Sequence, residues 1–78
     1  MKRHPNLREC EVAFAWEGYL CSAIRIPGER EVRLGFDQQG RLIELVGVHT
    51  IDGWLVFHAM TPPSNKTIDE MRRAMRRL

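Results

Sequence analysis

Three side chains in the middle of the chain have the types that proton and phosphoryl chemistry needs: Arg33, Glu44 and His58. A histidine beside a carboxylate can take up and release protons near neutral pH. An arginine close to them would stabilise negative charge on phosphoryl oxygens. These groups could cleave RNA without a metal, because the 2′-hydroxyl of RNA is itself the nucleophile. The same residue types also form ordinary cross-strand ion pairs and structural hydrogen bonds.

Further cations would hold the phosphates of such a substrate. Lys66 lies where a helix is expected to begin, and the first turn of a helix offers backbone N–H donors to a phosphate. Arg25 and Arg41 complete the predicted RNA-binding set. The segment from Lys66 to Leu78 carries more basic than acidic side chains. This balance favours binding to nucleic acid or to an acidic protein, and it equally complements a helix dipole.

Alternation in three predicted strands, residues 31–37, 41–49 and 54–60, places these groups on one sheet face. The apolar residues that alternate along each strand are assigned to the inner face. The inner set is Val32, Leu34, Phe36, Ile43, Leu45, Leu55, Phe57 and Ala59. The outer set is Arg33, Glu44, Val46, Val48, Trp54, Val56 and His58.

The outer set also contains an apolar group that favours a different function. Trp54, Val46 and Val56 would form an exposed patch, and small monomers seldom leave such patches bare. The alternative function is therefore a non-catalytic module that binds a partner protein through the outer sheet face. Convergence of the polar residues would favour RNA chemistry, and their dispersal would favour the binding module.

The remaining elements follow from local signals. A first helix is expected from an Asn6 cap to residues 17–20, with Leu7, Cys10, Ala13, Phe14, Trp16 and Leu20 as its apolar stripe. A strand is expected at 22–26, a hairpin at Asp52-Gly53, and a stop at Pro62-Pro63. A second helix begins at a Ser64 or Thr67 cap, with Ile68, Met71, Met75 and Leu78 on one face. The predicted fold class is α+β: an N-terminal helix, a four-stranded antiparallel meander and a C-terminal helix, in a single domain spanning residues 1–78.

Composition restricts the class of protein further. The chain has 78 residues, 44% of them hydrophobic, and a net charge of +2, which is ordinary for a small globular domain. No apolar run approaches the roughly 20 residues that cross a bilayer, and no signal peptide is recognisable, so a cytoplasmic protein without membrane contact is expected. Cys10 and Cys21 lie too far apart on the expected helix for a disulfide, and they fit no zinc pattern. Neither a metal nor a cofactor is expected.

Several short motifs resemble small bacterial toxins of the BrnT type, within the RelE/ParE superfamily of toxin–antitoxin systems. They are the opening His4-Pro5-Asn6-Leu7 and three strand sequences: Val32-Arg33-Leu34-Gly35-Phe36-Asp37, Gly40-Arg41-Leu42-Ile43-Glu44-Leu45-Val46 and Phe57-His58-Ala59-Met60-Thr61-Pro62-Pro63. The resemblance implies a ribonuclease toxin that acts on RNA and is neutralised by an antitoxin protein, with a homodimer left open. Met60 stands where BrnT-like chains usually carry an arginine, which leaves a purely binding member as the alternative.

Overall fold

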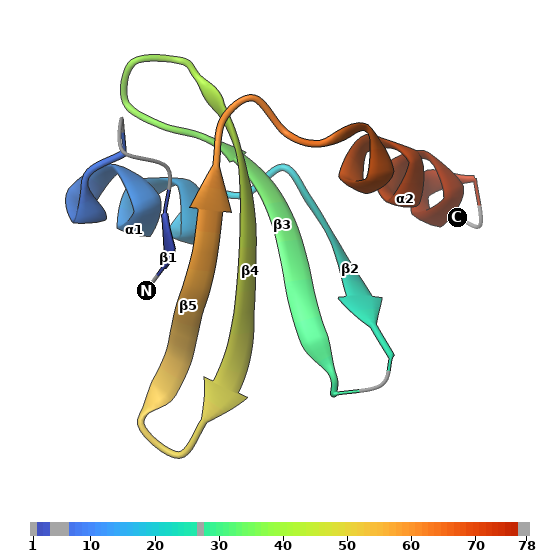
Figure 1. The fold of residues 1–78 in the computed structure, drawn as a ribbon, viewed down its shortest axis with the longest axis horizontal. Helices are drawn as coiled ribbons and strands as arrows, with labels where there is room; N and C mark the ends of the chain where they lie inside the picture. The colour runs from blue at the N-terminus through green and yellow to red at the C-terminus, as the bar shows by residue number, and fades with distance from the viewer. Residues whose placement is uncertain (1, 4–6, 27, 77–78) are drawn as a thin grey trace.

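Five strands and two helices make up the computed structural model, which describes residues 2–3, 7–26 and 28–76. In chain order they are β1 (Lys2–Arg3), α1 (Glu9–Glu17), β2 (Cys21–Arg25), β3 (Arg30–Phe36), β4 (Leu42–Thr50), β5 (Gly53–Met60) and α2 (Asn65–Met75) (Figure 1). The sheet order is β1-β5-β4-β3-β2. The predicted α+β fold, with an antiparallel meander between two helices, is confirmed. The short β1, which pairs in parallel with β5, was not predicted.

Helix α1 begins later than the sequence suggested. Its N-cap is Arg8, whose backbone N–H donates to Glu11 Oε1 at 3.1 Å, and its C-cap is Gly18. The predicted cap, Asn6, lies outside the described residues. The helix is capped at Arg8, two residues after the predicted cap. The carboxylate that completes the first turn belongs to Glu11, because it lies three residues after the actual cap.

One face of the sheet packs against α1, and we call it the α1 face. Its core joins Val12, Ala15 and Trp16 of the helix to Ile43, Leu45 and Ala59 of β4 and β5. The predicted helix stripe is partly wrong, because Cys10, Ala13, Phe14 and Leu20 are exposed. Helix α1 carries apolar residues on two of its own sides, so their spacing alone did not determine which side would be buried.

The opposite face packs against α2, and we call it the α2 face. Its core contains Val32 and Leu34 of β3, Val46 of β4 and Met71 of α2. Helix α2 lies beside β2 at one side of the sheet, as Figure 1 shows. The α2 N-cap is Ser64, whose Oγ accepts a hydrogen bond from the Thr67 N–H at 3.3 Å. Among the described residues, no helix is long and apolar enough to cross a membrane.

Two glycines allow α1 to approach the sheet closely. A Cβ on Gly35 of β3 would lie 2.2 Å from the backbone oxygen of Ala15. A Cβ on Gly47 of β4 would lie 2.8 Å from the Trp16 ring. The absence of a side chain at both positions therefore sets the distance between α1 and the sheet.

We predict that Gly35→Ala lowers the free energy of unfolding by about 1–3 kcal/mol, because the added methyl collides with helix backbone that cannot rotate away. Gly18→Ala is the matched control, since its Cβ would meet nothing closer than the Phe14 oxygen at 3.5 Å. Urea denaturation of the two variants and the wild type measures the difference. Equal stability of the two variants would contradict this account of the packing.

Candidate functional site

Glu44 and His58 lie together on the α2 face. His58 pairs with Val46 across the β4–β5 ladder, and its Nε2 lies 2.9 Å from Glu44 Oε2. The other carboxylate oxygen of Glu44 accepts hydrogen bonds from the Ser64 amide at 3.0 Å and the Ser64 hydroxyl at 2.7 Å. One buried carboxylate thus joins β4, β5 and the first turn of α2. The alternation had placed Glu44 and His58 on the same face.

Glu44 is held in its ionised form. Burial would raise the pKa of its carboxyl, but hydrogen bonds from Thr67, Ser64 and His58 outweigh burial and hold the pKa below its usual value of 4.5. Near neutral pH Glu44 is therefore a charged acceptor and has no proton to donate. Its contact with His58 Nε2 makes Glu44 a residue that orients the His58 ring.

His58 keeps one ring nitrogen available. Its side chain is 35% exposed, and its contact with Glu44 uses Nε2. No described residue hydrogen-bonds to Nδ1. A carboxylate on one nitrogen and an accessible second nitrogen are what a histidine general base requires.

Arg33 lies on the other face of the sheet, so the structure does not bring the three predicted catalytic residues together. In the β3–β4 ladder Arg33 pairs with Leu45, whereas Glu44 pairs with Leu34. The predicted register of β4 differs from the observed one by one residue. Because helices cover both faces of the sheet, β4 is apolar on both sides, and its alternation did not identify the inner face.

The Arg33 side chain is the centre of an aromatic cluster on the α1 face. Its guanidinium lies 3.8 Å from the ring centroid of Trp16, 4.2 Å from that of Tyr19 and 5.1 Å from that of Trp54. It also donates to the Trp16 carbonyl at 3.0 Å and pairs with Glu31. With a side chain only 11% exposed, Arg33 has a packing role here.

The predicted partner-binding group is also divided between the two faces. Val46 is buried beneath α2, whereas Trp54 contacts Trp16 and Val56 packs on the α1-face core. The cause is a β-bulge: Val46 pairs with His58 but Gly47 pairs with Val56, which leaves Phe57 as an extra residue. The bulge reverses the side-chain alternation in β5 and separates His58 from Trp54 and Val56.

The predicted phosphate-binding cations have different surroundings. Lys66 is exposed in the first turn of α2, two residues after Ser64. Arg25 lies on the α2 face, but it forms an ion pair with Glu70 at 2.6 Å and donates to Thr67 at 3.0 Å. Arg41 contacts α1 instead: it bridges Asp37 at 2.7 Å and Glu11 at 2.5 Å. Arg41 is therefore not part of the His58 site.

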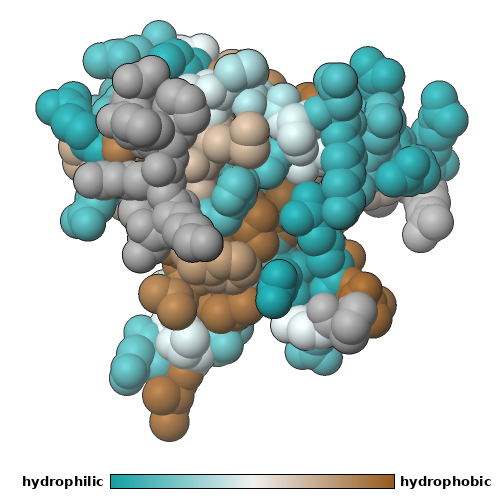
Figure 2. Space-filling view, in the orientation of Figure 1, coloured by the Kyte–Doolittle hydropathy of each residue, from teal (hydrophilic) through white to brown (hydrophobic). Residues whose placement is uncertain are grey.

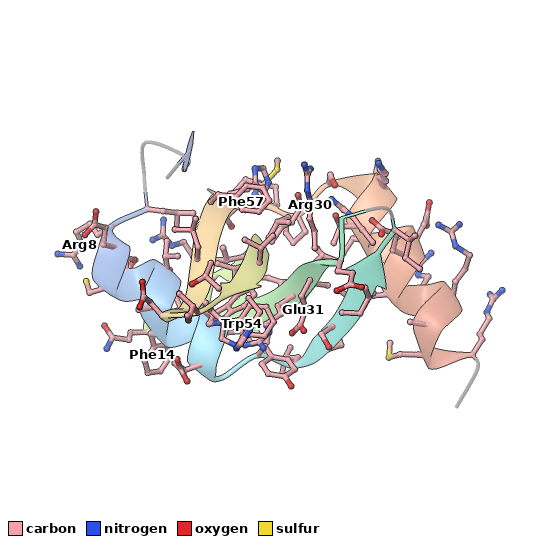
Figure 3. The ribbon with its side chains drawn as sticks, turned by 90° about the horizontal axis from the view of Figure 1, so that it is seen from below. Arg8, Phe14, Arg30, Glu31, Trp54 and Phe57 are labelled. Carbon is pink, nitrogen blue, oxygen red and sulfur yellow. The ribbon has the colours of Figure 1, made fainter. Side chains whose placement is uncertain are left out.

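Sequence reasoning missed Arg30, an exposed cation on the α2 face. Its guanidinium lies 5.4 Å from the ring centroid of Phe57, the residue before His58. In Figure 3 Arg30 and Phe57 project from one side of the sheet, and Trp54 and Glu31 from the other. Figure 2 views this α2 face and shows hydrophobic residues in its middle, with hydrophilic residues over α2. The alternation of Arg30 with Val32 and Leu34 could have identified it.

The described residues bring together no group of three His, Cys, Asp or Glu side chains that could hold a metal ion. Cys10 and Cys21 are both free, and burial raises the pKa of the Cys21 thiol.

Comparisons with known protein families, curated proteins and solved structures find no match for this chain. The resemblance to BrnT-type toxins is therefore a hypothesis that rests on short motifs alone.

We predict that Glu44→Gln lowers the free energy of unfolding by about 1–3 kcal/mol at pH 7, because the charged acceptor of three hydrogen bonds is lost. The pKa of Glu44 is lowered on folding, so its stabilisation is complete above its usual pKa of 4.5 and is lost as pH falls through the lowered value. The difference in the free energy of unfolding between the wild type and the variant should therefore disappear at acidic pH. Urea denaturation from pH 7 downward measures it, with Glu29→Gln, an exposed turn residue, as control. A gap that stays constant with pH would contradict this assignment.

Proposed function

We propose that this chain is a toxin-like ribonuclease of the bacterial cytoplasm that cleaves RNA on its α2 face, with His58 as the catalytic base. The observation that carries the proposal is the partly exposed His58 ring bonded to the buried, ionised Glu44. In a chain without catalytic metal ligands among its described residues, this pair is the group best suited to proton transfer near neutral pH.

The reaction uses the hydroxyl group of RNA itself. His58 Nδ1 takes the proton of the 2′-hydroxyl, and the resulting oxygen attacks the adjacent phosphorus. The bond from phosphorus to the 5′ oxygen breaks, and that oxygen leaves with a proton from solvent. The products are a 2′,3′-cyclic phosphate and a 5′-hydroxyl end, and the imidazolium returns its proton to water. Glu44 orients the ring and stabilises its positive charge.

Arg30 and Lys66 would supply the positive charge for the phosphates. Both are exposed: Arg30 lies on β3, which forms part of the α2 face, and Lys66 lies in the first turn of α2. The α2 N-terminus contributes less than an open helix end, because the Glu44 carboxylate already occupies its cap. Met60 pairs with Glu44 in the ladder, so the arginine that the BrnT resemblance implies is absent from the site itself.

A second candidate function rests on the aromatic cluster of the α1 face. Trp54 is 42% exposed and Tyr19 43% exposed, and both contact the partly buried Arg33. Tryptophan, tyrosine and arginine dominate the binding energy of many protein interfaces. This observation favours a non-catalytic module that binds a partner protein, such as an antitoxin, through the α1 face.

We predict that purified protein cleaves an RNA oligonucleotide in the presence of a metal chelator and that His58→Gln lowers the rate by at least about 100-fold. His49→Gln is the matched control, because His49 is an exposed histidine that contacts Trp54 on the other face. Gel analysis of the product ends gives the rate and the expected cyclic phosphate.

Induced expression in bacteria gives a second measure, in which the wild type should arrest growth and His58→Gln should relieve the arrest at equal protein level. Absence of both cleavage and arrest from folded wild-type protein would overturn the ribonuclease. Arrest relieved by Trp54→Ala but not by His58→Gln would support the interaction module instead.

A further inference from the structure

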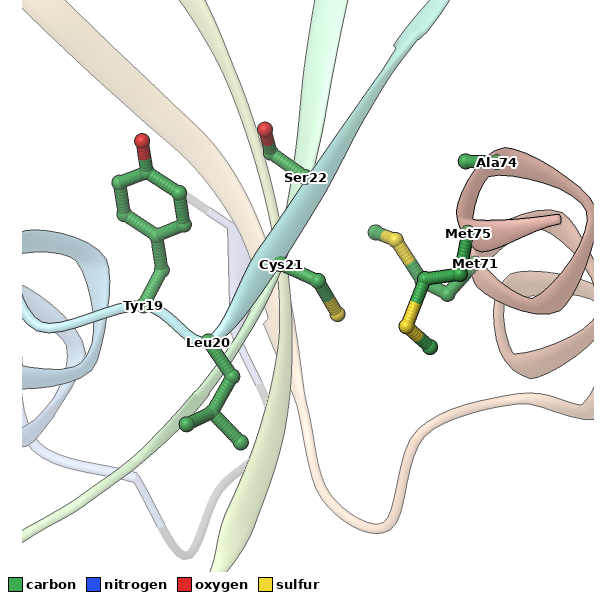
Figure 4. Close-up of a pocket in the computed structure, with 7 residues that line it drawn as sticks. All are labelled: Tyr19, Leu20, Cys21, Ser22, Met71, Ala74 and Met75. Atoms are coloured by element: carbon green, nitrogen blue, oxygen red, sulfur yellow. The ribbon is translucent and has the colours of Figure 1, made fainter. Parts of the chain in front are cut away.

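An open groove separates the start of β2 from the second half of α2. Its walls include Tyr19, Leu20 and Cys21 on the strand side and Met71, Ala74 and Met75 on the helix side (Figure 4). The groove has a volume of about 330 Å³ and lies apart from the Glu44–His58 pair. The lining is largely apolar, and it contains three sulfur atoms.

The local structure brings the three sulfur atoms to the same groove. Cys21 pairs with Leu34 in the β2–β3 ladder, so its side chain lies on the α2 face. Met71 and Met75 are four residues apart in α2, which places both side chains on one side of that helix. Figure 4 shows the Cys21 thiol and the two thioethers directed toward the same space.

Core packing explains only part of this arrangement. Met71 is 3% exposed and belongs to the α2-face core, whereas Met75 is 54% exposed and Cys21 is only partly buried. An exposed methionine contributes little hydrophobic stabilisation. Ala74, which has a small side chain, lines the same groove.

We propose that this groove binds one monovalent copper ion through Cys21 Sγ, Met71 Sδ and Met75 Sδ. Thiolate and thioether ligands are soft donors that suit Cu(I), whereas Mg²⁺ and Ca²⁺ prefer oxygen ligands. Zn²⁺ takes thiolate, imidazole and carboxylate ligands, so two thioethers favour Cu(I) over it. Binding forms three Cu–S bonds and releases the thiol proton to solvent. The thiolate then cancels the charge of the ion, so a neutral centre lies in an apolar groove.

The ligand set also has the adaptability that such a centre needs. Each methionine has three rotatable side-chain bonds, so its sulfur can move toward the ion without moving the helix. Among the described residues, no histidine, aspartate or glutamate lines the groove to attract a harder metal. This inference does not depend on the proposed ribonuclease, because none of the three ligands belongs to the His58 site.

The test is competition for Cu(I), added without oxygen as its acetonitrile complex, against the chromophoric chelator bicinchoninate. Wild-type protein should take up one equivalent. Cys21→Ser should weaken binding by at least about 100-fold, and Met75→Leu, a volume-conserving change at an exposed position, by at least about 10-fold. Cys10→Ser and Met60→Leu change the same residue types outside the groove and should bind as the wild type does.

A second readout does not depend on any variant. Addition of Cu(I) to wild-type protein should shift the methyl NMR signals of Met71 and Met75 and leave that of Met60 in place. Competition in which the wild type binds no better than Cys21→Ser would overturn the proposal. So would equal loss of binding in Cys10→Ser, or methyl signals of Met71 and Met75 that do not move.

Discussion

The Glu44 carboxylate connects the sheet to α2, and much of the α2 face depends on it. It accepts hydrogen bonds from the Ser64 amide and hydroxyl on one side and contacts His58 on the other. A buried carboxylate needs such partners, because an isolated charge in the interior is costly. Its position fixes where α2 starts, which ring nitrogen of His58 is engaged and, through the direction of the helix, which α2 residues face β2.

The sheet has a helix on each face, and this arrangement explains which predictions could be made from sequence. Boundaries that depend on local chemistry were predictable: the Asp52-Gly53 hairpin, the double proline after β5 and the Ser64 cap. Face assignments were not, because β4 is buried on both sides and its pattern does not favour one register. The bulge at Phe57 also switches the sheet face of the β5 side chains, and a regular alternation pattern cannot predict such a switch.

The candidate site was therefore predictable only in part. The proximity of Glu44 and His58 followed from their types and strand positions, but Arg33 was assigned to them on the assumption that polar strand residues face solvent. Arg33 is instead covered by aromatic rings, which accept a guanidinium as readily as an apolar side chain. The groove between β2 and α2 could not be predicted without the tertiary structure, since Cys21 and the methionines of α2 lie about 50 residues apart in the chain.

Helix α2 makes more tertiary contacts at its N-terminal end than at its C-terminal end. Its first turns are held by Ser64, by the buried Thr67 and by the Arg25–Glu70 ion pair, whereas Met75 and Arg76 in its last turn are exposed. Local opening of a helix starts where tertiary contacts are fewest, so backbone amides near its C-terminus should exchange with solvent sooner than those near Thr67. A ligand that joins the last turn of α2 to β2 would remove this gradient, and order in the helix would then report whether the groove is occupied.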